Sequence, residues 1–95
     1  MTYKFTDPAN TACFVCNHVL NKQRSISYVT HEAEDGFWQF LCGQNDHPND
    51  EDYKVISLEQ VITIDASVND LYDMPLGIGA TRNNQSGKWE PFNLN

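Results

Sequence analysis

The chain has 95 residues and a formal charge of −7, from 13 acidic and 6 basic residues. This length is enough for one domain, and no apolar run reaches the roughly 18–20 residues that a membrane-spanning helix needs. An acidic surface is repelled by phosphate backbones, which argues against nucleic-acid binding and leaves a basic protein partner as the plausible one. We expect a cytoplasmic protein, because the N-terminus lacks a signal pattern and three cysteines do not fit a closed disulfide framework.

The first half of the chain is predicted to form strands after a loose polar lead-in over residues 1–11. Asp35 and Gly36 predict a tight turn, because both residue types tolerate positive φ. The segments rich in apolar, β-branched and aromatic residues are predicted strands, and the first two are expected to pair as a hairpin: residues 12–19, 25–30, 37–42 and 53–56.

Helical signals follow residue 56. Ser57 and Gln60 have the spacing of a capping box, and apolar residues recur at helical spacing behind them, which predicts a short helix over residues 58–64. A second helical turn is expected through Val68 and Leu71, and it ends before a proline. The strand-like end of residues 76–82 and the segment 88–92 are predicted to return to the sheet.

These segments together predict a single α+β domain over residues 12–92, followed by a short tail over residues 93–95. The strand over residues 37–42 is too apolar to be exposed on both faces, so we expect it to be central. The expected architecture is an antiparallel sheet of about four to five strands, with one or two short helices on one face.

The cysteines and two of the histidines fall in two short clusters that have two interpretations. Zinc prefers about four thiolate or imidazole ligands, and a zinc site in this chain would draw on Cys13, Cys16, Cys42, His47 and His18. Against a metal, the apolar residues around Cys13 and Cys16 favour a regular strand, on which these two side chains point to opposite faces. Free cysteine also packs as a small buried hydrophobe. Two alternatives stay open: no cofactor with reduced, mostly buried thiols, or one zinc ion.

The sequence contains no distinctive catalytic arrangement. Cys16, His18 and Asp35 are residue types that nucleophilic catalysis uses, but such trios occur in almost any small protein. We therefore predict a protein that is not an enzyme.

Several stretches of the chain resemble a known group of proteins. They are Cys-Phe-Val-Cys-Asn-His-Val at 13–19, Asp-Gly-Phe-Trp-Gln-Phe-Leu-Cys-Gly at 35–43, the segment 65–77 and Ala-Thr-Arg at 80–82. Over roughly residues 12–92 the chain is similar to small uncharacterised bacterial proteins related to an immunity-protein domain of unknown function. This resemblance implies a binding role, in which an immunity-type protein sequesters a toxin. The acidity suits a basic toxin, because complementary charge speeds encounter.

An acidic loop and one tryptophan are the predicted contacts with that partner: Asp46, Asp50, Glu51, Asp52 and Trp89. The alternative for the loop is a solvated connection between two strands. The alternative for Trp89 is that it folds back onto the sheet. No membrane partner is expected.

Overall fold

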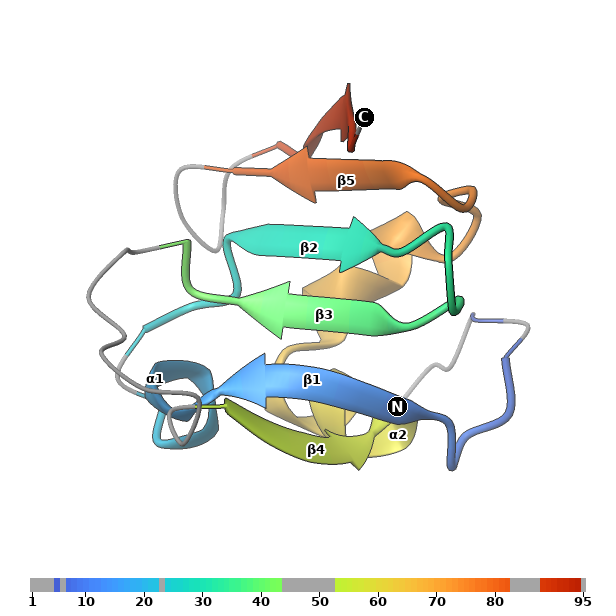
Figure 1. Cartoon of the computed structure of the whole chain (residues 1–95). Coiled ribbons are helices and arrows are strands. Elements are labelled where there is room, and N and C mark those ends of the chain that lie inside the picture. The colour runs from blue at the N-terminus through green and yellow to red at the C-terminus, as the bar shows by residue number, and fades with distance from the viewer. Residues whose placement is uncertain (1–4, 6, 23, 44–52, 83–87, 95) are drawn as a thin grey trace.

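Six strands form one mixed sheet in a computed structural model that describes residues 5, 7–22, 24–43, 53–82 and 88–94 (Figure 1). The order of the strands across the sheet is β4-β1-β3-β2-β5-β6. Their bounds are β1 Ala12–Cys16, β2 Tyr28–His31, β3 Trp38–Leu41, β4 Tyr53–Ser57, β5 Ile78–Thr81 and β6 Glu90–Asn93. The sheet therefore has more strands than the four to five that the sequence predicted.

The predicted hairpin between the first two strands is wrong. Strand β3 lies between β1 and β2, and it runs parallel to β1, with Cys13 opposite Trp38 and Val15 opposite Phe40. All other strand pairs are antiparallel. This order places the two strands that carry the most completely buried side chains next to each other in the middle of the core.

The first strand is also shorter than predicted. It ends at Cys16, and the chain turns at once into the short helix α1 (Asn17–Leu20) at one end of the sheet. Lys22 just beyond α1 has a positive φ of 60°, a left-handed turn conformation that reverses the chain. The apolar Val19 and Leu20 fit a continued strand, but Val19 is buried from a helix instead.

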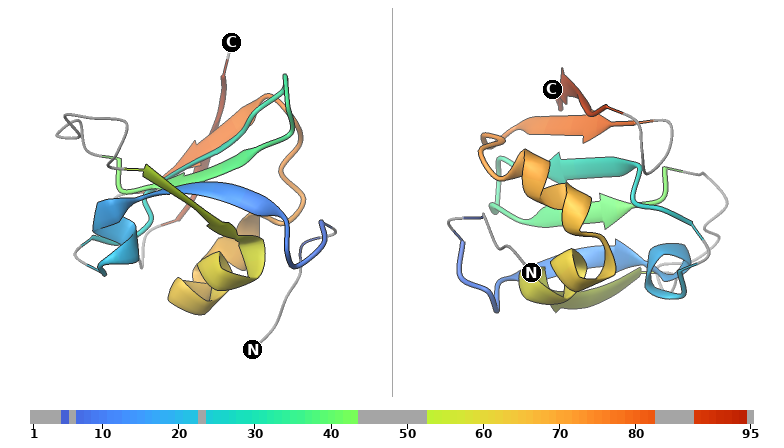
Figure 2. Two further views of the ribbon diagram at one scale, coloured as in Figure 1. Left: turned by 60° about the horizontal axis from the view of Figure 1, so that its bottom comes forward. Right: turned by 180° about the vertical axis from the view of Figure 1, so that it is seen from behind.

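Two helices cover one face of the sheet (Figure 2). Helix α2 (Leu58–Ile64) has the predicted capping box, and the 3-10 helix η2 (Ala66–Leu71) follows it with Asp65 as its N-cap. Apolar side chains from both helices are fully or almost fully buried against the sheet, among them Leu58, Val61 and Val68.

The core lies between these helices and the face of the sheet that carries Val15, Trp38 and Phe40. Phe5 from the lead-in belongs to the same core, and its ring meets Trp38 edge-on with centroids 5.1 Å apart. His31 stacks on Trp38 at 3.9 Å and hydrogen-bonds through Nδ1 to the carbonyl of Met74 at 2.8 Å. Aromatic packing thus joins the lead-in, β2 and β3.

No helix of the described residues covers the opposite face of the sheet (Figure 2). Several large side chains lie on this face. Strand register places them on this face. Phe14 lies opposite Val55. Tyr28 lies opposite Thr81 of β5, and Gly79, two residues before Thr81, lies opposite Phe92 of β6. We call this surface the open face, and define it by Phe14, Tyr28, Phe37, Tyr53, Val55 and Phe92.

Candidate functional site

Three of the predicted metal ligands meet at one end of the sheet: Cys16, His18 and Cys42. Cys16 is the last residue of β1, and Cys42 follows the last residue of β3. Because β1 and β3 are parallel neighbours, their last residues lie at the same end of the sheet, only one strand spacing of about 4.8 Å apart. The turn into α1 then brings His18 back over the same edge.

The ligand atoms of these three residues, two Sγ atoms and one ring nitrogen, all lie within 4.8 Å of one another. Cys42 Sγ is 3.9 Å from His18 Nδ1. Arg24 belongs to the same cluster: its Nη1 lies 3.3 Å from His18 Nδ1 and donates to Cys42 Sγ at 3.6 Å. The cluster therefore contains two sulfurs and one imidazole, and the Arg24 guanidinium contacts the imidazole and the Cys42 sulfur.

Both thiols of this cluster are buried, whereas His18 is half-buried. Burial raises the pKa of the Cys16 thiol, because the interior disfavours the charged thiolate. Backbone N–H groups of Val19 and Cys42 act in the opposite direction on that pKa, since they hydrogen-bond to the sulfur. Without a cation, Cys16 is thus a neutral thiol near pH 7.

Cys13 lies apart from this cluster. Its side chain is fully buried on the core face beside Trp38, and its Sγ donates to the carbonyl of Thr11 at 3.5 Å. Burial, and to a lesser degree the carboxylate of Asp7, raises the pKa of the Cys13 thiol to about 12. All three cysteines are free thiols. The structure therefore separates the two members of the Cys-x-x-Cys pair, as expected for a regular strand.

Most of the predicted partner contacts, and one predicted metal ligand, lie outside the described residues: Asp46, His47, Asp50, Glu51 and Asp52. Trp89 is described, and it is half-buried against the core. The guanidinium of Arg82 lies over the Trp89 ring at 4.1 Å from its centroid. One face of the Trp89 ring is therefore covered by the Arg82 guanidinium.

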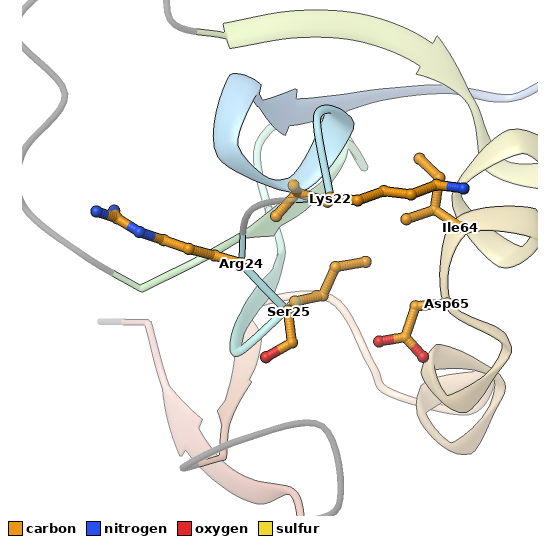
Figure 3. Close-up of a pocket in the computed structure, with 7 residues that line it drawn as sticks. Lys22, Arg24, Ser25, Ile64 and Asp65 are labelled. Carbon is orange, nitrogen blue, oxygen red and sulfur yellow. The ribbon is translucent and has the colours of Figure 1, made fainter.

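A pocket of about 260 Å³ opens between α1, the segment before β2 and the end of α2 (Figure 3). Asp65 points its carboxylate toward this space, and Lys22 reaches across to Ile64, whereas the Arg24 guanidinium extends away from it. The Asp65 carboxylate is bound by Arg82 Nη2 at 2.8 Å and by Ser67. The pocket is thus lined by both basic and acidic side chains, and the Asp65 carboxylate is already bound by residues of the fold.

The trio that resembles a hydrolase triad is not assembled. Cys16 and His18 are at the edge where β1 and β3 end, whereas Asp35 is in the turn before β3 begins, at the opposite end of the sheet. Asp35 Oδ1 accepts a hydrogen bond from the Phe37 backbone at 3.0 Å and so shapes its own turn. Asp35 is therefore too far away to orient His18 as the third member of a catalytic triad.

A match to a family model identifies the family of the chain. The model of the immunity protein Imm33 domain matches residues 13–93. The chain belongs to the Imm33 immunity protein family.

The family match confirms the expected relation to immunity proteins, and the matched range reaches from the second residue of β1 to the last residue of β6. Both the cysteine cluster and the open face therefore lie inside the Imm33 domain. No curated protein and no solved structure matches the chain. Within the part of the chain that the structure describes, no helix has the length and apolarity to cross a bilayer.

The open face is a functional candidate that reasoning from the sequence missed. Its signal was present, because the apolar residues of β1 and β3 fall on both sides of each strand: Phe14 alternates with Cys13 and Val15, and Phe37 alternates with Trp38. The sequence predicted helices on one face of the sheet, but the opposite face was not considered as a contact surface. Among the described residues, the helices α2 and η2 lie on one side of these strands, and no helix lies over the other side.

Proposed function

We propose that this chain is an immunity-type protein that binds a toxin and blocks it without chemistry of its own. Family membership supports this role. The observation that carries the proposal is the open face, where exposed Tyr53 and Val55 share one side of the sheet with four half-buried aromatic residues, because apolar side chains gathered on one accessible surface are typical of a protein-binding site. The partner we expect is a basic toxin that acts in the same compartment, the cytoplasm.

The open face has the composition of an interaction surface. Val55 is 56% exposed and Tyr53 is 36% exposed, both on the edge strand β4. Farther along the sheet, Phe14 and Phe37 pair at 5.1 Å, and Tyr28 and Phe92 pair at 5.6 Å. Aromatic residues supply large contact area at a small cost in conformational entropy and dominate the energetics of many interfaces.

Charge supports a basic partner. The whole chain carries −7. Two described carboxylates flank the open face: Asp35 adjoins Phe37 in the turn before β3, and Glu90 lies opposite Thr81 on the outward side of β6. An apolar centre with acidic margins matches a partner whose apolar contact is ringed by lysine and arginine, and such complementarity raises the association rate.

The first test asks whether the chain protects cells from a toxin. Candidate toxins come from the reading frames that flank this gene, and each is expressed with and without the chain. We expect one of them to arrest growth, the wild-type chain to restore growth, and the two purified proteins to form a stoichiometric complex. A growth-arresting toxin that the chain neither binds nor neutralises would contradict the immunity role.

The second test locates the contact on the same toxin. We expect Val55→Asp to weaken binding at least tenfold, because it places a charge in the apolar surface that the partner must desolvate. Leu76→Asp is the matched control, since Leu76 is also 56% exposed but lies in the connection between η2 and β5. Equal affinities for Val55→Asp and the wild type, measured by calorimetry, would move the contact away from the open face.

A further inference from the structure

We propose that Cys16, His18 and Cys42 form a binding site for Zn²⁺. The proposal does not rest on the toxin contact, because the three ligands lie at the end of the sheet where β1 and β3 terminate and none of them is among the residues that define the open face. Cys16 nevertheless lies opposite Tyr53 of that face in the strand register. It also differs from the ligand set that the sequence predicted, since Cys13 is directed into the core.

The chemistry of the three donors selects the ion. Two thiolates and one imidazole are soft to intermediate ligands, and they favour Zn²⁺ over Mg²⁺ or Ca²⁺, which prefer oxygen. The thiols lose their protons when the metal binds. Three protein ligands account for three of about four tetrahedral positions and leave one for water or another donor.

The geometry is close to what the ion requires. Zn–S bonds of about 2.3 Å and Zn–N bonds of about 2.0–2.1 Å in a tetrahedron imply ligand separations of roughly 3.6–3.8 Å. Cys42 Sγ and His18 Nδ1 are 3.9 Å apart, and no pair of ligand atoms in the group exceeds 4.8 Å. The ligand atoms therefore need to approach one another by at most about 1 Å to reach these separations.

Arg24 is the group that zinc must displace. Its Nη1 contacts His18 Nδ1 and Cys42 Sγ, the two donors nearest the surface, so it occupies the lone pairs that the ion would use. A guanidinium this close also repels a dication. Because Arg24 is only half-buried, we expect its side chain to turn toward solvent when zinc enters.

The experiment measures Zn²⁺ binding to the full chain, purified without a metal-affinity tag. Competition with a chromophoric chelator gives the affinity, and Co²⁺ substitution gives a thiolate-to-metal charge-transfer band that reports sulfur ligation directly. We expect about one ion per chain. We expect Cys16→Ser, Cys42→Ser and His18→Gln each to weaken binding at least tenfold, and Arg24→Gln to strengthen it about tenfold.

Cys13→Ala is the matched control: it removes a thiol three residues from Cys16 on the same strand, and we expect it to leave the stoichiometry and the cobalt spectrum unchanged. The spectrum of the wild-type chain keeps the test decisive even if a cysteine variant fails to fold. Less than about 0.1 ion per chain at a hundredfold excess of zinc, or a cobalt complex without a charge-transfer band, would overturn the site. Weaker binding in Arg24→Gln would overturn the competition by Arg24.

Discussion

Cys13 and Cys16 show how three residues of sequence separate two chemical environments. Cys13 is sealed between the sheet and the helices, and its thiol has only a backbone carbonyl as a hydrogen-bond acceptor. Cys16 is equally buried but lies at the strand end, where a second sulfur and an imidazole meet it. The first thiol is therefore a packing residue, and the second is a candidate ligand.

The buried Cys13 thiol makes the fold sensitive to alkaline pH. Its pKa is raised from 9.0 to about 12, so the unfolded chain loses this proton first as the pH rises. The contribution of Cys13 is complete below pH 9 and declines between pH 9 and about 12, by about 1.4 kcal/mol per pH unit. Urea unfolding at a series of pH values checks this. We expect Cys13→Ala to show a shallower alkaline decline than the wild type, and parallel curves would refute the assignment.

At the scale of elements, one residue joins the edge strand to the helix layer. Ser57 ends β4 and is also the N-cap of α2. Its Oγ accepts from the Gln60 backbone at 3.2 Å, while the Gln60 side chain accepts from the Ser57 backbone at 2.9 Å. This reciprocal pair satisfies two N–H groups that the helix itself cannot, and it was readable from the sequence because it depends on residues three apart.

Ser57→Ala tests that junction. We expect it to lower the free energy of unfolding by about 1 kcal/mol, because a helix N-terminal N–H loses its acceptor. Thr63→Ala, which removes a hydroxyl from the same helix where it bonds back to the Glu59 carbonyl, should change stability by less than about 0.5 kcal/mol. Chemical denaturation of both variants measures the difference. Equal losses would show that the cap does not hold the helix.

At the scale of the whole molecule, Arg82 ties the sheet to the helices. It leaves the end of β5 and donates from Nε to the carbonyl of Ile26 at 2.8 Å, ahead of β2. Its other nitrogens reach Ser67 and Asp65 at 2.8 Å each, and both charged side chains are at least 96% buried. With Trp89 stacked on its guanidinium, one arginine connects four segments that are distant in the chain.

Asp65→Asn isolates the charge in this network, since asparagine keeps the size and the capping oxygen of the aspartate. We expect a loss of about 3 kcal/mol, because the variant leaves the Arg82 cation buried without its counter-ion. That is a large share of the roughly 5–15 kcal/mol that stabilises a domain. Asp70→Asn on the exposed side of η2 is the control and should be nearly neutral. Thermal and urea unfolding measure both, and a loss below about 1 kcal/mol for Asp65→Asn would refute the network's role.

The sequence by itself determined what depends on neighbours along the chain. The regions of β2 to β6, the helix over residues 58–64 with its cap, the second helical turn and the relation to immunity proteins were all readable from local patterns. The alternation of apolar and polar residues and the capping of helices depend on residues two to four apart, so both can be recognised without knowledge of the fold. The turn into α1 escaped because its apolar residues fit a strand equally well.

Only the tertiary structure decided the order of the strands, and with it both candidate sites. An antiparallel meander would have put β2 between β1 and β3, with Cys16 and Cys42 two strand spacings apart, about 10 Å. Because β3 inserts beside β1, the two sulfurs meet at one edge with His18. The same order brings Phe14 of β1 beside Phe37, which precedes β3, and Tyr28 of β2 beside Phe92 of β6, on the face that no described helix covers. Strand order follows from burying Val15, Trp38 and Phe40 together, a demand between distant residues that no local pattern expresses.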